Sequence, residues 1–457
     1  MASALAWRCL VCGYVHTGAA PPEECPVCGA GRGDFEPYEA TPAEAAEAEG
    51  GPSSGFSGKL AIVGGGIAGV MAAEAAREAA PAADIAIWSE EVEPPYHRLA
   101  LTRLIAGEIE ETDLPLHPPA WYEERRLRLQ CGRRVATLDP AARRLRLEDG
   151  ERHEYDRLIL APGARPNVPA ISGVELEGVG TLRTRADAAR LIAEAERGAR
   201  FVFVGGGILA LEAAAALRRR GGETILLERA SRLLPRQLNE RGARVLERHA
   251  AAAGIHVVSG ARVSAIRGAR RAEEVRLEDG RVFPADVIVI SAGVRPATDL
   301  AESGGLHVER GVIVDDRLAA SAPDVYAAGD AAEHRGVLYG TWEPARFQGR
   351  IAGWNAVGRP AEFGGMPRSN TLKVMGVQLF SVGETEGREE QVVEEETERG
   401  YFAFFFRGVE LVGAILLGDT SAATGVRRAI EFREDVGAWL AKGAGAAELA
   451  AHLGATA

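Results

Sequence analysis

The sequence predicts an α/β protein in which one strand–turn–helix unit occurs twice. From Lys59 onward, apolar β-type runs alternate with alanine-rich helical segments, which is the pattern of parallel sheets covered by helices. Two segments, KLAIVGGGIAGVMAAEAA at 59–76 and ARFVFVGGGILALEAAAAL at 199–217, resemble each other and begin about 140 residues apart. Each is typical of a strand, a glycine turn and a helix, so we expect two Rossmann-like domains related by duplication.

Changes in composition divide the chain into further parts. The first 38 residues are dotted with aromatic side chains, and the next 20 consist mainly of Glu, Ala, Pro, Gly and Ser, which cannot bury enough apolar surface to fold. The predicted parts are a small metal-knuckle domain at 1–38, a flexible linker at 39–58, a first nucleotide-binding domain at 59–167 and 295–360, a second at 168–294, and a small α+β domain with a tail at 361–457.

Bulk properties exclude several classes of function. The chain of 457 residues is 46% hydrophobic and 26% charged, as in ordinary globular proteins. Its formal net charge of −12 argues against a nucleic-acid partner, which would require clustered cations. No apolar run approaches the roughly 20 residues that span a bilayer, and the N-terminus lacks the features of a signal peptide. We therefore expect a cytoplasmic protein with no membrane partner.

The first glycine motif is Gly64-x-Gly66-x-x-Gly69, directly after the strand LAIV. These glycines permit a tight turn and a close approach of the backbone to a pyrophosphate at a helix N-terminus. The next strand, DIAIW, ends before Glu90 and Glu91, about 20 residues further on. A carboxylate there can bind ribose hydroxyls, and we assign this role to Glu90.

The second motif is Gly205-x-Gly207-x-x-Ala210, and its following strand ends at Glu228. Glu228 can accept hydrogen bonds from an unphosphorylated ribose and would repel a 2′-phosphate, which favours NADH. Arg229 and Arg232 lie close enough in sequence to leave NADPH open.

Four of the five cysteines form two Cys-x-x-Cys pairs near the N-terminus: Cys9, Cys12, Cys25 and Cys28. Tetrahedral sulfur ligation selects iron or zinc, and the glycine after each pair lets backbone N–H groups turn toward the sulfurs. The quartet therefore predicts a one-metal site. The spacing by itself fits both an electron-carrying iron and a structural zinc ribbon.

Residues 59–440 resemble the FAD-dependent pyridine nucleotide oxidoreductases, in the branch of NADH:rubredoxin, nitrite and ferredoxin reductases. The resemblance rests on YDRLILAPGARP at 155–166, VIVISAGVRPATDL at 287–300 and DVYAAGDAAE at 324–333. It implies that Ala161, Gly163 and Asp330 contact FAD, with Asp330 bonded to the ribitol chain. It also implies that the helix within 339–358 directs its N-terminus at the flavin.

The same resemblance implies roles for three further residues. Arg98 falls near the expected FAD pyrophosphate. Arg103 stands where many relatives carry a lysine close to flavin N5, and Glu212 stands where its partner acid sits. We expect an Arg103–Glu212 ion pair on the nicotinamide side of the flavin, with two unrelated surface charges as the alternative. The change from lysine to arginine alters the geometry of such a pair.

Residues 1–38 resemble rubredoxin, through WRCLVCGYVHTGAAPPEECPVCGA at 7–30. Fusion to a flavin reductase favours iron over zinc, because an electron carrier has use for the flavin. The remaining cysteine, Cys131, lies outside the segment that follows the first ribose acid. We expect it to be a buried small residue, and a single thiol excludes an internal disulfide mechanism.

These expectations combine into an NAD(P)H:rubredoxin oxidoreductase with its own rubredoxin, passing electrons from NADH through FAD and iron to an external acceptor. By family analogy the acceptor is a rubrerythrin or a flavodiiron protein. The first alternative is a flavin-dependent NADH reductase whose zinc ribbon docks a partner, and the second is a flavoprotein redox sensor or assembly factor. In relatives the small C-terminal domain often forms dimer interfaces, which leaves a homodimer open.

Overall fold

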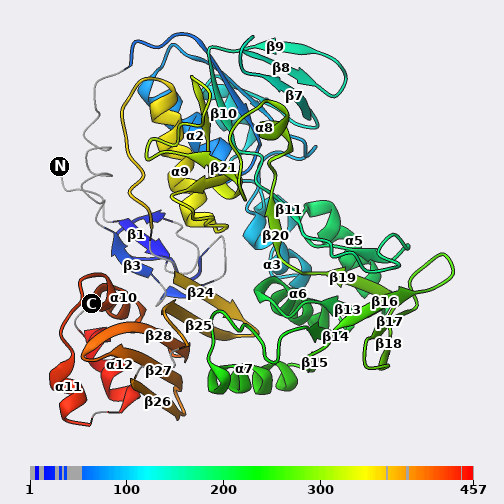
Figure 1. Cartoon of the computed structure of the whole chain (residues 1–457), viewed down its shortest axis with the longest axis vertical. Coiled ribbons are helices and arrows are strands. Elements are labelled where there is room, and N and C mark those ends of the chain that lie inside the picture. Colours follow the sequence, from blue (N-terminus) through cyan, green and yellow to red (C-terminus); the bar gives the residue numbers. More distant parts are fainter. Residues whose placement is uncertain are drawn as a thin grey trace.

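A computed structural model describes most of the chain (Figure 1). The described residues are 6–9, 15–25, 30–32, 35–38, 54–366, 369–386, 391–443 and 445–455. Two of the predicted metal ligands, Cys12 and Cys28, lie outside the described residues, as do residues 39–53 of the predicted linker.

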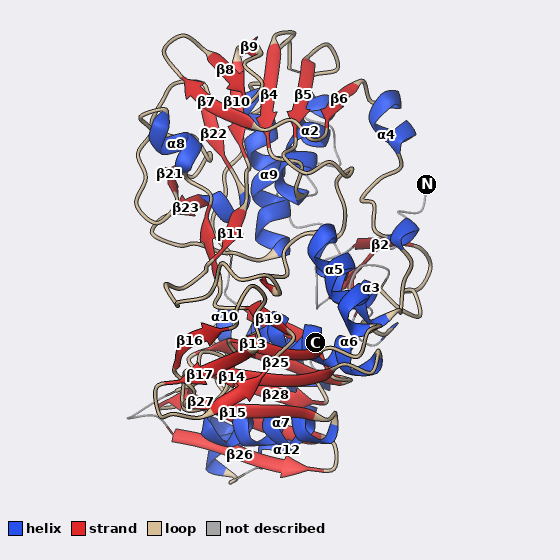
Figure 2. Ribbon diagram, turned by 90° about the vertical axis from the view of Figure 1, so that its right-hand side faces the viewer, coloured by secondary structure: helices blue, strands red, loops and turns tan. Residues whose placement is uncertain are grey.

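The first nucleotide-binding domain is built on a five-stranded parallel sheet. Its strand order is β22 (Val325–Ala327), β10 (Arg157–Leu160), β4 (Lys59–Val63), β5 (Asp84–Trp88) and β6 (Leu127–Gln130). Helices α2 (Ile67–Ala79) and α9 (Trp342–Ala356) pack against this sheet, which occupies the upper part of Figure 2. The apolar runs of β4, β5 and β10 are almost fully buried, as expected for strands covered on both faces.

Shorter elements complete this domain. They are an antiparallel sheet of β7 (Val135–Asp139), β8 (Arg144–Leu147) and β9 (Arg152–Glu154), the pair β21 (Val312–Val314) and β23 (Ala332–His334), helices α4 (Pro119–Glu124) and α8 (Asp299–Ser303), and 3₁₀ turns at Arg98–Ala100, Glu111–Asp113 and Gly329–Ala331. Helix α3 (Leu101–Ala106) belongs to the same stretch of chain but packs against the core of the second domain.

The second domain repeats the plan of the first. Its parallel sheet has the order β12 (Val179–Gly180), β19 (Val287–Ile290), β13 (Arg200–Val204), β14 (Glu223–Glu228) and β15 (Ile255–Ser259). Its helices are α5 (Arg185–Ala195), α6 (Ile208–Arg219) and α7 (Glu240–Ala252), and an antiparallel sheet contains β16 (Val263–Arg267), β17 (Glu274–Leu277) and β18 (Val282–Pro284). The chain passes between the two domains at β11 (Ala164–Pro166) and β20 (Val294–Pro296), which pair with each other.

The C-terminal domain is a five-stranded antiparallel sheet with helices on one face. The strands follow the order β24 (Ser369–Val374), β25 (Val377–Gly383), β28 (Glu410–Gly418), β27 (Gly400–Arg407) and β26 (Gln391–Thr397), and the helices are α10 (Ala423–Glu431), α11 (Gly437–Ala441) and α12 (Ala446–Ala455).

Strand β27 shows why both faces of this sheet are buried. Its side chains alternate, so that Phe402 and Phe404 pack with the C-terminal helices, whereas Tyr401 and Phe405 pack with the second nucleotide-binding domain. The Tyr401 hydroxyl donates to Asn239, which caps α7. The predicted α/β class, the duplicated unit and the small α+β domain are confirmed.

The N-terminal domain forms a three-stranded antiparallel sheet of β2 (Val15–Thr17), β1 (Ala6–Cys9) and β3 (Phe35–Tyr38). In Figure 1 this sheet lies between α9 and the C-terminal domain. Residues 54–58, assigned above to the linker, instead pack on the first nucleotide-binding domain. The Ser54 N–H donates to the Ala79 carbonyl at 2.7 Å, and Phe56 packs against the domain core. The linker boundary therefore needs correction at this end.

No helix in the described part of the chain combines the length and the apolar character that a membrane crossing requires.

Helices α2 and α9 touch backbone to backbone. A methyl group on Gly349 would lie 2.2 Å from the Ala68 carbonyl oxygen, and one on Gly353 would lie 2.3 Å from the Ala72 carbonyl oxygen. Residues without a side chain are therefore required at these two positions of α9. The contact fixes the start of α9 relative to the start of α2, and both helix starts border the cavity described below.

We predict that Gly353→Val destabilises the protein by about 3 kcal/mol, because α9 must move away from α2 to admit the side chain. Chemical denaturation of the purified protein measures this change. Gly364→Ala serves as the control, since a methyl group at Gly364 would meet no described atom within 4 Å. Equal free energies of unfolding for wild type and Gly353→Val would contradict the close packing of α9 on α2.

Candidate functional site

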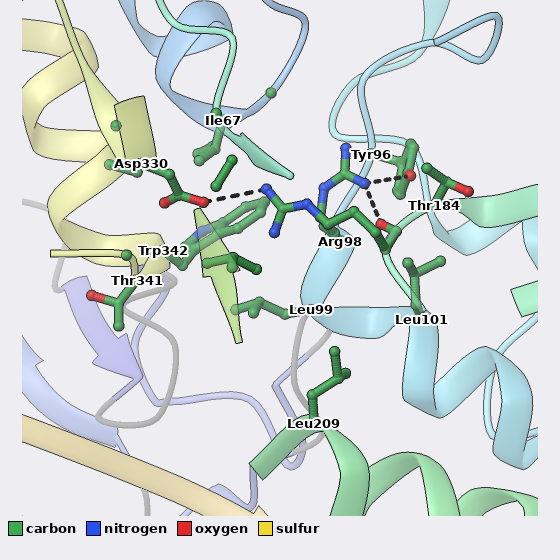
Figure 3. Close-up of a pocket in the computed structure, with 18 of the residues that line it drawn as sticks. Ile67, Tyr96, Arg98, Leu99, Leu101, Thr184, Leu209, Asp330, Thr341 and Trp342 are labelled. Atoms are coloured by element: carbon green, nitrogen blue, oxygen red, sulfur yellow. Dashed lines mark hydrogen bonds and ion pairs between the residues drawn. The ribbon is translucent and has the colours of Figure 1, made fainter. Parts of the chain in front are cut away.

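A cavity of about 1910 Å³ opens between the two nucleotide-binding domains. Its walls are the glycine turns after β4 and β13, helix α3, the first turn of α9 and residues of the N-terminal domain. Figure 3 shows part of the cavity, with Arg98, Tyr96 and Thr184 on one side and Asp330, Thr341 and Trp342 on the other. This volume is large enough for extended cofactors rather than a single small substrate.

The first glycine turn directs the start of α2 into the cavity. Gly64 has φ of 118°, and a methyl group there would lie 2.0 Å from the Ala161 carbonyl oxygen. Gly69 packs equally closely on the Gly64 carbonyl oxygen, whereas a methyl group on Gly66 would meet no described atom within 4 Å. Space therefore remains in front of the helix N-terminus, where unpaired N–H groups suit a pyrophosphate.

The second turn has the same construction. Gly205 has φ of 115° and lies against the Ser291 carbonyl oxygen, and open space faces Gly207 at the start of α6. Ala210 is buried in the position where the helix packs on the strand. Both turns thus fit a dinucleotide, and they face one shared cavity.

The two predicted ribose acids differ in their surroundings. Glu228 is half-buried, and its carboxylate accepts hydrogen bonds from the N–H groups of Gly206 at 2.7 Å and Ala230 at 2.6 Å. Glu90 is exposed at the cavity edge, 3.9 Å from both Arg134 and Arg165. The carboxylate of Glu228 is therefore fixed in place, whereas that of Glu90 faces solvent.

The two arginines after Glu228, which in the sequence leave NADPH as a possible cofactor, also differ in their surroundings. Arg232 pairs with Glu386 and donates to the Leu238 carbonyl at 3.3 Å, so it connects the loop after β14 to the C-terminal domain. Arg229 is exposed to solvent.

Arg98 lies at the centre of a polar network on the cavity wall. It pairs with Glu91, bonds the Arg183 carbonyl, and donates to the Tyr96 hydroxyl at 3.0 Å (Figure 3). Burial raises the pKa of Tyr96, so its hydroxyl remains protonated and donates to Glu91 at 2.6 Å. Glu91, the acid not chosen from the sequence, therefore fixes Arg98 rather than facing open space.

Three residues implied by the family resemblance border the same cavity. Ala161 and Gly163 follow β10, and Gly163 has φ of 74°, a conformation that favours glycine. Asp330 lies in the turn after β22, and its carboxylate pairs with Arg183 at 3.2 Å. Arg183 itself was not singled out from the sequence, because nothing in its local pattern indicates a cavity residue.

The expected Arg103–Glu212 ion pair is not formed, and this prediction needs correction. Among the described residues the partner of Glu212 is Thr102, whose hydroxyl donates to the carboxylate at 3.2 Å. Arg103 instead pairs with Glu24 of the N-terminal domain at 2.5 Å and with Glu108 at 3.4 Å. Arg103 thus bonds to the N-terminal domain and to Glu108, and it forms no ion pair with Glu212.

The electrostatics of Glu212 follow from this arrangement. Glu212 is half-buried, and the loss of water around its carboxyl group raises its pKa to about 7, although the Thr102 hydrogen bond acts in the opposite direction. Glu212 lines the cavity beside the start of α6. It is a carboxyl group on the cavity wall that can change protonation near neutral pH.

The N-terminal domain contributes the edge of the cavity. Cys9 and Cys25 are 1% and 0% exposed and belong to one apolar cluster with Ala30 and Phe35. The Cys25 N–H donates to the Ala30 carbonyl at 2.7 Å. Two buried thiols in one small cluster fit a four-cysteine metal site.

Contacts place this domain directly on the cavity wall. Arg103 donates to the Cys25 carbonyl at 3.3 Å, and Arg8 pairs with Glu343, in the first turn of α9, at 3.5 Å. Burial and the neighbouring His117 lower the pKa of His97 to about 4, while Cys25 acts to raise it.

Cys131 differs from the expectation of a buried residue. It follows β6, is only partly buried, and lies near Glu93. Burial, with a contribution from Glu93, raises the pKa of its thiol, which disfavours the reactive thiolate.

Comparison with known proteins agrees with this arrangement. Residues 58–349 match the family model described as pyridine nucleotide-disulphide oxidoreductase. The chain belongs to this family. Residues 369–434 match the rubredoxin NAD+ reductase C-terminal domain, and residues 7–36 match the rubrerythrin, rubredoxin-like domain. The predicted membership of this family, with a rubredoxin-type domain at the N-terminus, is confirmed.

Similar proteins include several reductases. The chain is 32% identical over 385 residues to a nitrite reductase [NAD(P)H] of Bacillus subtilis, covering 83% of this chain and 48% of that protein. It is 32% identical over 284 residues to the rubredoxin-NAD(+) reductase of Pseudomonas putida, covering 62% and 74%. The crystal structure of NADH:rubredoxin oxidoreductase from Clostridium acetobutylicum superposes with a TM-score of 0.72 at 27% identity, covering 83% and 96%. The chain thus spans about half the length of the nitrite reductase.

We predict that Glu212 makes stability depend on pH near neutrality. Its pKa is about 7 in the folded protein against an ordinary value of 4.5, so between these values the folded state binds more protons than the unfolded state. The free energy of unfolding of the wild type therefore falls as pH rises, by about 3 kcal/mol in total. Glu212→Gln removes this contribution to the pH dependence, because the amide does not titrate. Chemical denaturation of the wild type and of Glu212→Gln from about pH 5 to about pH 8 measures this effect, as a difference in the free energy of unfolding that grows with pH.

Thr102→Val is the companion variant for this measurement. It removes the hydrogen bond that lowers the pKa of Glu212, so the midpoint of the pH dependence moves upward. Parallel pH curves for wild type and Glu212→Gln would show that Glu212 does not titrate in this range.

Proposed function

We propose that the chain is an NAD(P)H:rubredoxin oxidoreductase that carries its own rubredoxin as the first electron acceptor. One observation carries this proposal: the segment around Cys25 borders the cavity into which both dinucleotide turns open, held there by Arg103. A metal domain that only stabilises the fold would not require contact with this cavity wall. The family membership and the rubredoxin NAD+ reductase C-terminal domain support the same activity.

The residues of the first domain fit FAD. The start of α2 would hold the pyrophosphate, with Gly64, Gly66 and Gly69 permitting its approach. Glu90 would accept hydrogen bonds from the adenosine ribose, and Arg98 would add positive charge near the pyrophosphate. On the opposite wall, Asp330 would bond the ribitol chain, beside Ala161 and Gly163.

The residues of the second domain fit a nicotinamide dinucleotide. Gly205 and Gly207 leave room at the start of α6, and the fixed carboxylate of Glu228 offers acceptor oxygens to ribose hydroxyls. Because Arg232 is already bound to Glu386, the cation left near a 2′-phosphate is the exposed Arg229. This balance favours NADH over NADPH.

Bound FAD would supply chemistry that nicotinamide lacks, because a flavin can accept a hydride and then release its electrons one at a time. Both dinucleotide turns open into one cavity, so the protein would hold the two cofactors side by side, and the start of α9 would present a positive helix end to the flavin. Glu212 and Thr102 would border the nicotinamide, where the carboxyl can hold a proton near neutral pH.

Cys9, Cys12, Cys25 and Cys28 would hold one iron, as the rubredoxin-like match implies. The two thiols that the structure describes are buried without a disulfide between them, as metal ligation requires. From this site single electrons would leave to an external protein, with rubrerythrin or a flavodiiron protein as the proposed classes of acceptor.

An anaerobic NADH titration of the FAD- and iron-loaded protein tests this function. Flavin takes two electrons and the iron takes one, so complete bleaching of both absorption bands requires about 1.5 equivalents of NADH. Protein loaded with zinc in the cysteine site requires about 1.0 equivalent and shows the flavin change alone. Iron that stays oxidised after the flavin is fully reduced would contradict the proposal.

A further inference from the structure

We propose that the N-terminal metal domain docks on the cavity wall in a single orientation, set by two ion pairs of opposite polarity, and that Arg103 is the residue that positions Cys25 for electron transfer. The inference rests on the proposed function, in which the metal domain is the acceptor. It adds the docking surface and the charge pattern that selects the productive orientation.

The first ion pair joins α3 to the metal domain. The guanidinium of Arg103 contacts two successive residues of that domain, the Glu24 carboxylate at 2.5 Å and the Cys25 carbonyl at 3.3 Å. The Arg103 side chain is 12% exposed and Glu24 is 58% exposed, so a largely enclosed cation receives an anion from the rim. A planar guanidinium that bonds two neighbouring groups fixes both direction and distance.

The second ion pair has the reverse polarity. Here the metal domain supplies the cation, Arg8, and the reductase supplies the anion, Glu343, at 3.5 Å. If the metal domain were turned so that its two charges changed places, Glu24 would meet Glu343 and Arg8 would meet Arg103. Such like-charge contacts disfavour the wrong orientation while the correct one gains two attractive pairs.

Both docking charges lie next to a metal ligand. Arg8 directly precedes Cys9, and Glu24 directly precedes Cys25, so each of the two cysteine pairs begins beside one ion pair. On the reductase, Arg103 and Glu343 line the same cavity from α3 and from α9. The docking charges therefore hold the metal-binding end of the domain, rather than some other face, against the cavity.

The side chains near this contact also border the cavity. The ring centre of His97 is 5.8 Å from that of Trp342, which lines the cavity. Arg98, the next residue, belongs to the polar network of the cavity wall. The Cys25 carbonyl is bonded to Arg103, which itself lines the cavity, so Cys25 lies next to the cavity wall.

Electrostatic docking of this kind is reversible. Both ion pairs are partly exposed, so added salt weakens them. Reversibility is what the proposed function requires, since the metal domain must also meet an external acceptor.

Stopped-flow mixing of the FAD- and iron-loaded full chain with excess NADH tests the inference, because flavin reduction and the later bleaching of iron are recorded separately. Glu24→Arg should slow iron bleaching about tenfold without changing flavin reduction. Salt should slow the wild-type step by screening attraction and should accelerate the variant by screening repulsion. The double variant Glu24→Arg with Arg103→Glu should recover most of the lost rate of iron bleaching.

Arg32→Glu is the control, because it reverses a charge of the same domain at a side chain that does not line the cavity and that pairs with Glu23 within that domain at 2.7 Å. It should retain the wild-type rate. Equal slowing by both single variants, a wild-type rate in Glu24→Arg, or failure of the double variant to recover would each overturn the docking inference. Absence of iron bleaching in the wild type would instead overturn the proposed function itself.

Discussion

Close contact between backbone atoms at Gly64 and Gly205 determines the geometry of the whole site. Each glycine lies against the carbonyl of a neighbouring strand end, Ala161 in one domain and Ser291 in the other, at a distance that excludes a side chain. Each turn then begins a helix whose free N–H groups face the cavity. Since α9 also touches α2 through glycine, the parts of the first domain that would surround a flavin are fixed by contacts that tolerate no added methyl group.

The N-terminal domain lies at the open side of this cavity and contributes residues to its edge. Arg103 extends from α3 to the metal domain instead of to Glu212, and this arrangement has two consequences. It provides an attachment point next to Cys25, and it leaves Glu212 without a cationic partner among the described residues.

Sequence patterns identified much of this structure because they reflect local geometry. The glycine turns, the acids at the ends of β5 and β14, and the duplicated sheets are each encoded within about 30 residues, where spacing and periodicity are informative. The pairing of Arg103 with Glu24 was missed because 79 residues separate them, and no local pattern links two charges so far apart. The end of the linker was misplaced for a similar reason, since Ser54 and Phe56 are ordered by contacts with distant segments.

The central claim, electron transfer from flavin to the chain's own metal site, is tested most directly by the dependence of that step on protein concentration. The rate constant for iron bleaching after rapid reduction by NADH should remain constant over about a hundredfold dilution, because docking within one chain has a fixed effective concentration. A rate constant that rises in proportion to protein concentration would show that electrons pass between separate molecules, and would contradict electron transfer within one chain.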